Sequence, residues 1–158
     1  KNLIYMIELF NSFKNKKYEL ILDIYGDNID NSMCKKFYEN LNPINKIRFF
    51  PKISNLESIL FKYDFYISTS LWEGYPNSLI TAASSGCIPI ATNAGDSWDL
   101  LGNNLFKLRK NIKYDLKIIH KAIIFNEKNS RENRSINSIE FLRKGFINSL
   151  NFSDLYFQ

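Results

Sequence analysis

Residues 68–99 read STSLWEGYPNSLITAASSGCIPIATNAGDSWD, and this stretch decides the fold. Its Ser-rich start closes an apolar run that begins at Phe65, and an Ala-rich segment of helical character follows. A second apolar run, residues 88–92, comes soon after Gly86, a residue typical of a helix C-terminus. The order predicts a strand, a turn, a helix and a second strand, which is how parallel strands are connected in α/β proteins.

The turn between this strand and helix, residues 73–78, has the composition of an anion-binding turn. Gly74 permits a backbone turn that other residues cannot make, and Pro76 fixes φ near the helix entry. Asn77 or Ser78 is expected to cap the helix. The first amides of the helix would then face the space beyond the strand end, where the helix dipole favours a phosphate. In open α/β sheets that space is the usual ligand site.

Hydrophobic periodicity predicts alternating helices and strands along the rest of the chain. The predicted strands are residues 19–25, 47–50, 65–70, 88–92 and 105–108. The predicted helices are residues 3–13, 31–41, 54–63, 79–85, 98–101, 114–126 and 131–150. Strands that alternate with helices pair in parallel through right-handed crossovers. The sequence therefore predicts an α/β fold, a three-layer doubly wound parallel sheet of the Rossmann-like type, in a single domain over residues 1–158.

Composition excludes several classes of protein. The chain has 158 residues, 45% of them hydrophobic, which excludes a disordered protein, and no apolar run approaches the roughly 20 residues that cross a bilayer. The net charge is +5, but basic residues form no stripe with aromatics, so no nucleic-acid partner is predicted. Cys34 and Cys87 lack metal-ligand spacing, which favours a reducing cytoplasm, and we expect Cys87 to be buried. No Asp-x-Asp or His cluster offers a metal site, and the single histidine, His120, has no partner that would make it a base.

Residues 72–96, WEGYPNSLITAASSGCIPIATNAGD, carry a family resemblance. The segment resembles the donor-binding part of the retaining glycosyltransferases of family four, which have the GT-B fold. The order of Glu-Gly-aromatic-Pro, a helix, Ala-x-x-x-Gly, x-Pro-hydrophobic-hydrophobic and a Gly-Asp turn is much more specific than a lone glycine motif. The resemblance implies that the chain is the C-terminal, nucleotide-sugar-binding half of a GT-B fold. The first strand of that half would lie upstream of Lys1, and if it is central its absence leaves a slot in the sheet.

The resemblance also implies roles for particular residues. Glu73 matches the first acid of the family's Glu-x7-Glu motif, which approaches the donor sugar next to its anomeric carbon. Lys1 resembles the lysine of an Arg-x4-Lys pair that neutralises the leaving diphosphate. The turn whose amides hold sugar hydroxyls and the diphosphate corresponds to Gly74, Tyr75, Pro76, Asn77, Ser78 and Leu79. The loops that flank the nucleotide base correspond to Gly26, Asp27, Pro51 and Lys52.

Two positions depart from the family's pattern. The second Glu of the motif, which bonds the ribose hydroxyls, falls on Thr81. A hydroxyl replaces at most one acceptor of a carboxylate, so the ribose contact is weakened by about 1–3 kcal/mol unless another group holds the ribose. Pro51 stands where the family usually has Gly, which removes a backbone donor.

The function implied by the resemblance is transfer of a sugar, with retention and without a metal or other cofactor, from a nucleotide-sugar donor. The acceptor would be a saccharide, a lipid-linked sugar or a glycan, as in polysaccharide biosynthesis, and would be bound by the protein's own N-terminal domain. The setting would be the bacterial cytoplasm, with peripheral association of the full-length protein at the inner face of the membrane as an open option. The alternative is a non-catalytic homologue, a nucleotide-sugar-binding or scaffolding module. A dinucleotide-binding enzyme is disfavoured because no Gly-x-Gly-x-x-Gly follows a strand, and a receiver domain because Asp23 lies inside a strand.

Overall fold

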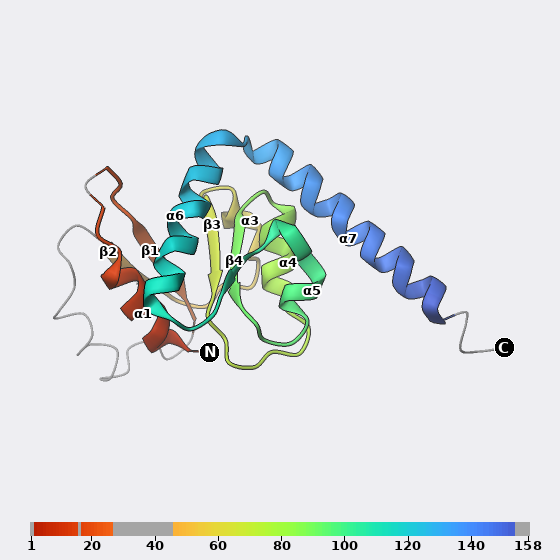
Figure 1. The fold of residues 1–158 in the computed structure, drawn as a ribbon, viewed down its shortest axis with the longest axis horizontal. Coiled ribbons are helices and arrows are strands. Elements are labelled where there is room, and N and C mark those ends of the chain that lie inside the picture. Colours follow the sequence, from red (N-terminus) through yellow and green to blue (C-terminus); the bar gives the residue numbers. More distant parts are fainter. Residues whose placement is uncertain (1, 16, 27–45, 154–158) are drawn as a thin grey trace.

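The structure is a computed structural model, and it describes residues 2–15, 17–26 and 46–153 (Figure 1). The predicted helix 31–41 lies outside the described residues, as do Lys1, Asp27 and Cys34.

Helices and strands alternate in the predicted order. The strands are β1 (Ile21–Tyr25), β2 (Lys46–Phe50), β3 (Phe65–Ser68), β4 (Ile88–Thr92) and β5 (Phe106–Leu108). The helices are α1 (Leu3–Ser12), α3 (Glu57–Leu60), α4 (Asn77–Ser84), α5 (Ser97–Leu101), α6 (Ile112–Lys128) and α7 (Arg131–Ser153), with a 3-10 turn at Gly102–Asn104. The main differences in length concern α3, which is much shorter than the predicted 54–63, and β3, which ends before Thr69. The residues after β3 therefore belong to the loop that leads into α4.

The strands are parallel, as predicted, but they form two sheets instead of one. One sheet pairs β1 with β2, and the other has the order β3-β4-β5. The break lies between β1 and β3. In the described part of the chain, no backbone ladder joins these two strands.

Side chains connect the two sheets instead. The Tyr63 hydroxyl, just before β3, donates to Asp23 Oδ2 of β1 at 2.7 Å and lies 2.6 Å from the Tyr25 hydroxyl. Arg48 of β2 binds both carboxylate oxygens of Asp23 at 2.7 Å. The hydrogen bonds from Arg48, which have the larger effect, and from Tyr63 lower the pKa of Asp23. Burial raises the pKa of Tyr63. The buried carboxylate is thus fully paired at the junction of the sheets.

Helices cover both faces of the three-stranded sheet, which gives the predicted three layers (Figure 1). On one face, α1 and α6 pack against β4 and β5 in a cluster that includes Leu9, Ile90 and Ile123. On the other face, α4, α5 and α7 pack in a cluster that includes Leu79 and Ala91. Every residue of β4 is buried because this strand is central and covered on both sides.

A buried acid ties α1 to the start of α6. Asp115 is fully buried, and its carboxylate accepts hydrogen bonds from the Tyr5 hydroxyl at 2.5 Å and from the amides of Arg109 and Asn111 at 2.9 and 3.3 Å. Burial, followed by this hydrogen bond, raises the pKa of Tyr5. The contact holds the layer that covers one face of the sheet.

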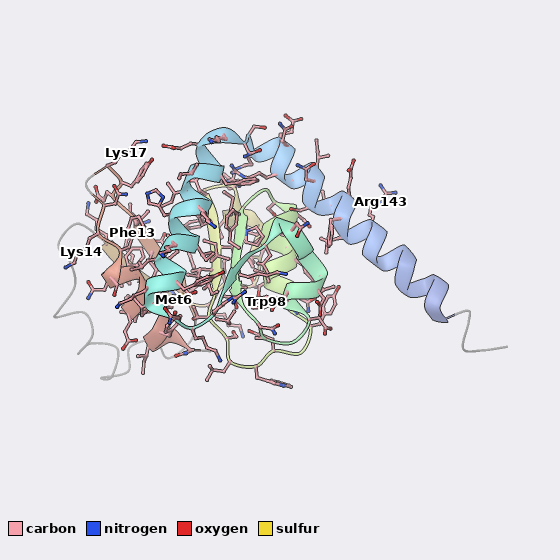
Figure 2. All side chains as sticks on the ribbon, viewed as in Figure 1. Met6, Phe13, Lys14, Lys17, Trp98 and Arg143 are labelled. Carbon is pink, nitrogen blue, oxygen red and sulfur yellow. The ribbon has the colours of Figure 1, made fainter. Side chains whose placement is uncertain are left out.

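Two arginines fasten the first turns of α7 to the body of the domain. Arg131 donates to the carbonyls of Ser85 and Tyr63, and the buried Arg134 donates to the carbonyl of Gly86 at 2.8 Å. These carbonyls lie at the end of α4 and before β3, so the arginines satisfy acceptors that have no helical partner. Figure 1 shows the second half of α7 extending away from the layers, and Arg143 lies on this extension (Figure 2). No helix of the described residues is long and apolar enough to cross a membrane.

Candidate functional site

The predicted catalytic acid lies in the loop between β3 and α4, residues 69–76, which we call the acid loop. Glu73 is half-buried, and its Oε1 accepts a hydrogen bond of 2.5 Å from the Ser70 hydroxyl. Ser70 itself is only 1% exposed. The carboxylate is therefore held by a buried donor at the carboxyl end of β3, which is the end where α/β proteins bind ligands.

The start of the acid loop is fastened to two other elements. The Thr92 hydroxyl, at the end of β4, donates to the Ser70 carbonyl at 2.6 Å in a buried position. The Thr69 hydroxyl donates to the carbonyl of Asn2, the N-cap of α1, at 2.8 Å. The loop that carries Glu73 is thus connected to β4 and to α1.

The glycines of the site differ from the prediction. Gly74 was expected to need a conformation closed to other residues, but it has no positive φ, and a Cβ built on it meets nothing within 4 Å. The demanding position is Gly95 after β4, which has φ +56°. A Cβ there would lie 2.4 Å from the Gly74 carbonyl oxygen and 2.5 Å from that of Glu73. The acid loop rests on Gly95, while the space beside Gly74 is open.

The N-terminus of α4 is also built differently from the prediction. The helix begins at Asn77, the N-cap is Pro76, and no side chain makes a capping hydrogen bond, so neither Asn77 nor Ser78 is the cap. Pro76 has φ −83°, in keeping with its predicted place at the helix entry. The reason for the difference is that the backbone satisfies itself: the amides of Asn77 and Leu79 donate to the carbonyls of Tyr75 and Pro76 at 2.9 and 3.0 Å.

This internal pairing limits which amides of the turn can bind a ligand. Those of Asn77 and Leu79 already have partners, and the Leu79 side chain is buried. The Ser78 amide makes no hydrogen bond to any described residue, and the residue is half-buried. Thr81, where the family has its second acid, is half-buried one turn further along α4. The amides of Asn77, Leu79 and Ile80 at the helix start are thus paired within the turn.

Large apolar side chains of the acid loop face outward. Leu71, Trp72 and Tyr75 are 60%, 81% and 58% exposed. Trp98 of α5, labelled in Figure 2, is half-buried instead, and its indole N–H donates to the Ala91 carbonyl at 3.2 Å. The two tryptophans of the chain therefore lie in different surroundings, one exposed beside Glu73 and one packed on the sheet.

Three of the predicted base-flanking residues, Gly26, Pro51 and Lys52, lie where β1 and β2 end. The Gly26 amide donates to the Phe50 carbonyl at 3.1 Å, and the rings of Tyr25 and Phe50 stack with centroids 4.8 Å apart. Pro51 and Lys52 follow Phe50 and are exposed. The structure thus groups Gly26 with the end of β2, and Glu73 and Gly74 with Gly95.

A cavity of about 290 Å³ lies elsewhere, at the amino ends of the strands. Its lining includes Leu20, just before β1, Phe65 at the start of β3, and Ile123 of α6. Glu127 at its rim accepts hydrogen bonds from Lys17 and from the Tyr18 hydroxyl. The cavity occupies the break between the two sheets, and it does not coincide with the predicted donor site.

Residues capable of holding a metal do not gather in the described part of the chain, where no three His, Cys, Asp or Glu side chains form such a group. His120 is exposed on α6.

Cys87 is 1% exposed, which confirms the predicted burial, and that burial raises the pKa of its thiol.

Sequence reasoning missed Ser70, Thr92 and Gly95 as parts of the site. Ser70 could have been predicted, because a hydroxyl three residues before an acid at a strand end can reach that acid. The other two come from a different strand, so only the pairing of β3 with β4 brings them to the acid loop.

Comparison with known proteins places the chain among relatives. The family described as "Glycosyl transferases group 1" matches residues 1–136. The chain is 29% identical to Protein CapJ of Staphylococcus aureus over 135 residues, which is 81% of this chain and 34% of that protein. It therefore spans about a third of the length of this relative.

A solved structure, the catalytic domain of a cholesterol-alpha-glucosyltransferase from Helicobacter pylori, resembles this chain with a TM-score of 0.65. The sequences are 18% identical, and the match covers 94% of this chain and 91% of the other. At this identity the likeness concerns the fold, and it confirms the predicted Rossmann-like α/β architecture.

Proposed function

The chain belongs to the group 1 glycosyl transferases and has the Rossmann-like fold of a GT-B domain, and from this premise we propose that it binds a nucleoside diphosphate sugar for sugar transfer. The observation that carries the proposal is the position of Glu73. Its carboxylate is held at the carboxyl end of β3, at the entrance to α4, where the helix dipole attracts an anion.

The donor would lie across the carboxyl ends of the strands. Its diphosphate faces the first turn of α4 and the Ser78 amide, and its sugar lies beside Glu73, in the open space next to Gly74. The base lies toward Gly26, Asp27, Pro51 and Lys52, and Tyr75, Pro76, Asn77 and Leu79 shape the turn between sugar and diphosphate.

Transfer of the sugar requires stabilisation of two charges. The departing diphosphate gains negative charge, which the α4 dipole and the Lys1 ammonium would offset. The anomeric carbon gains positive charge, which the Glu73 carboxylate would offset. Retention would follow if the acceptor attacks from the face that the leaving phosphate occupies, and these steps use no metal. Thr81 offers the ribose a single hydroxyl.

The acceptor and the cellular setting extend the proposal to the whole protein. A saccharide, lipid-linked or glycan acceptor would be bound by an N-terminal domain of the same protein, in the cytoplasm or at the inner face of the membrane. The structural relative acts on cholesterol according to its name, which gives a lipid acceptor a precedent among proteins of this fold. The second candidate is a non-catalytic nucleotide-sugar-binding module, and Thr81 is the observation that favours it.

Isothermal titration calorimetry tests the proposal. The chain is titrated with uridine, guanosine and adenosine diphosphates and with their sugars. We expect one base series to bind. Glu73→Gln should weaken the binding of the nucleotide sugar by about ten- to hundredfold, because a charged hydrogen bond is lost. Glu140→Gln, at an exposed position in α7, is the matched control and should change nothing. Absence of binding by every nucleotide would refute the proposal.

One substitution separates the two candidates. Thr81→Glu restores the second acid of the family motif. A gain in donor affinity indicates a weakened but working donor site, as the transferase requires. No gain favours the non-catalytic module.

A further inference from the structure

Ser70 has the geometry of a residue that acts through Glu73. A serine hydroxyl carries a single hydrogen, and Ser70 gives it to Glu73 Oε1 at 2.5 Å. The hydroxyl is almost completely shielded from solvent, with 1% exposure, so water does not compete for this bond. The half-buried carboxylate is therefore held in one place before any ligand arrives.

Thr92 fixes Ser70 in turn. Its hydroxyl, also 1% exposed, donates to the Ser70 carbonyl at 2.6 Å. Ser68 and Ala91 are register partners in the β3-β4 ladder, so this bond continues the pairing of the two strands past the end of the ladder. The backbone that carries the Ser70 hydroxyl is thereby held to β4.

Gly95 fixes the backbone of the acid itself. The carbonyl oxygens of Glu73 and Gly74 approach its Cα so closely that a Cβ would lie within 2.5 Å of both. Gly95 lies three residues after Thr92, so one β4 end supports both the side chain and the backbone of Glu73. An acid that only needed solvation at the surface would require none of these three contacts.

We propose that Ser70, Thr92 and Gly95 are positioning residues that aim the Glu73 carboxylate at the sugar ring of the donor. This inference rests on the proposed function and adds to it a division of labour. The turn at the start of α4 binds the diphosphate, and the three positioning residues determine recognition of the sugar. Preorganised groups of this kind gain affinity because they lose little freedom when the ligand binds.

The experiment compares two ligands of one base series, for example UDP and UDP-glucose, on the unchanged chain and on Ser70→Ala. The measured quantity is the ratio of their dissociation constants. We expect Ser70→Ala to weaken the binding of UDP-glucose by about tenfold. The dissociation constant of UDP should stay within about twofold of its original value, because the diphosphate does not contact Glu73. Ser85→Ala, which removes a hydroxyl bonded to the Thr81 carbonyl at the far end of α4, is the matched control and should leave the ratio unchanged.

Further variants exclude a merely structural effect. Thr92→Val keeps the shape of the side chain, lacks the hydroxyl and should shift the ratio in the same direction. Ser70→Thr keeps a hydroxyl and should restore part of the discrimination. In a cycle with Glu73→Gln, the loss caused by Ser70→Ala should largely disappear, because the acid through which Ser70 acts has been changed.

The outcomes separate the two claims. If Ser70→Ala and Thr92→Val weaken the binding of UDP and UDP-glucose equally, or weaken the binding of neither ligand, the positioning role is wrong while the donor site stands. If no nucleotide of any series binds the unchanged chain, the proposed function fails, and the positioning role fails with it. If Ser70→Ala does not fold, Thr92→Val decides, alone and in the same cycle with Glu73→Gln.

Discussion

Exchanging the two glycines of the site for alanine should have opposite consequences. Gly74 has no positive φ and open space where a Cβ would lie, so Gly74→Ala is free of strain in the folded chain. Because alanine also restricts the unfolded chain, the free energy of unfolding should stay the same or rise by about 0.4–1 kcal/mol.

Gly95→Ala should behave differently. Its φ of +56° costs an alanine about 1–2 kcal/mol, and its Cβ would overlap the carbonyl oxygens of Glu73 and Gly74. Backbone atoms cannot swing away as a flexible side chain can, so the acid loop must shift. We therefore expect a loss of at least about 2 kcal/mol.

Urea denaturation followed by circular dichroism measures both variants. With a slope of about 2 kcal/mol per molar urea, Gly95→Ala should lower the midpoint by about 1 M, and Gly74→Ala should leave it unchanged or slightly higher. Calorimetry should show that Gly74→Ala nevertheless weakens the nucleotide sugar, because its methyl group enters the space that we assign to the donor. A stable Gly95→Ala protein together with a destabilised Gly74→Ala protein would contradict this reading of the site.

Three further predictions concern the scaffold. Asp115→Ala leaves the buried Tyr5 hydroxyl and two part-buried amides without their acceptor and should lower the free energy of unfolding by about 3 kcal/mol in the same urea assay; a change below about 1 kcal/mol would disprove its role. In a Cys34→Ser background, a thiol reagent should label Cys87 only when the chain unfolds, because burial raises the pKa of this thiol; rapid labelling of the folded chain would contradict this. The lowered pKa of Asp23 stabilises the fold above the unfolded-state value of about 4, and this contribution is lost as the pH falls through the lowered pKa. Arg48→Met should therefore reduce the loss of stability between pH 5 and pH 3, by a small amount since Arg48 is largely exposed, and an unchanged pH profile would count against the pair.

The parts of the fold that could be predicted from the sequence are those set by local patterns. β4 is a short apolar run, and it is buried along its whole length. Gly86, predicted to end α4, has φ +82°, which few other residues adopt. The order of elements, the parallel pairing and the three layers follow from such signals.

The features that the sequence did not reveal depend on contacts between distant residues. The division into two sheets and the bonds from Arg131 and Arg134 join segments far apart in the chain. α3 is shorter than its pattern predicts, and we have no physical account of this.

The site shows the same limit. Resemblance pointed to Glu73 and to the turn that follows it, but the conformational need that sequence reasoning assigned to Gly74 belongs to Gly95. Backbone carbonyls took the place of the predicted cap at Asn77, because the chain turns tightly after Pro76. A motif can thus identify the loop of a site without revealing what holds it in place.

The central claim is that the donor binds at the carboxyl ends of the strands, and mapping of amide shifts tests it directly. Addition of the nucleotide sugar that binds in calorimetry to labelled protein should shift the amides of Glu73, Gly74, Ser78 and Gly95, together with Gly26. Shifts confined to the residues around the cavity at the amino ends, such as Tyr18, Leu20 and Glu127, would contradict the account.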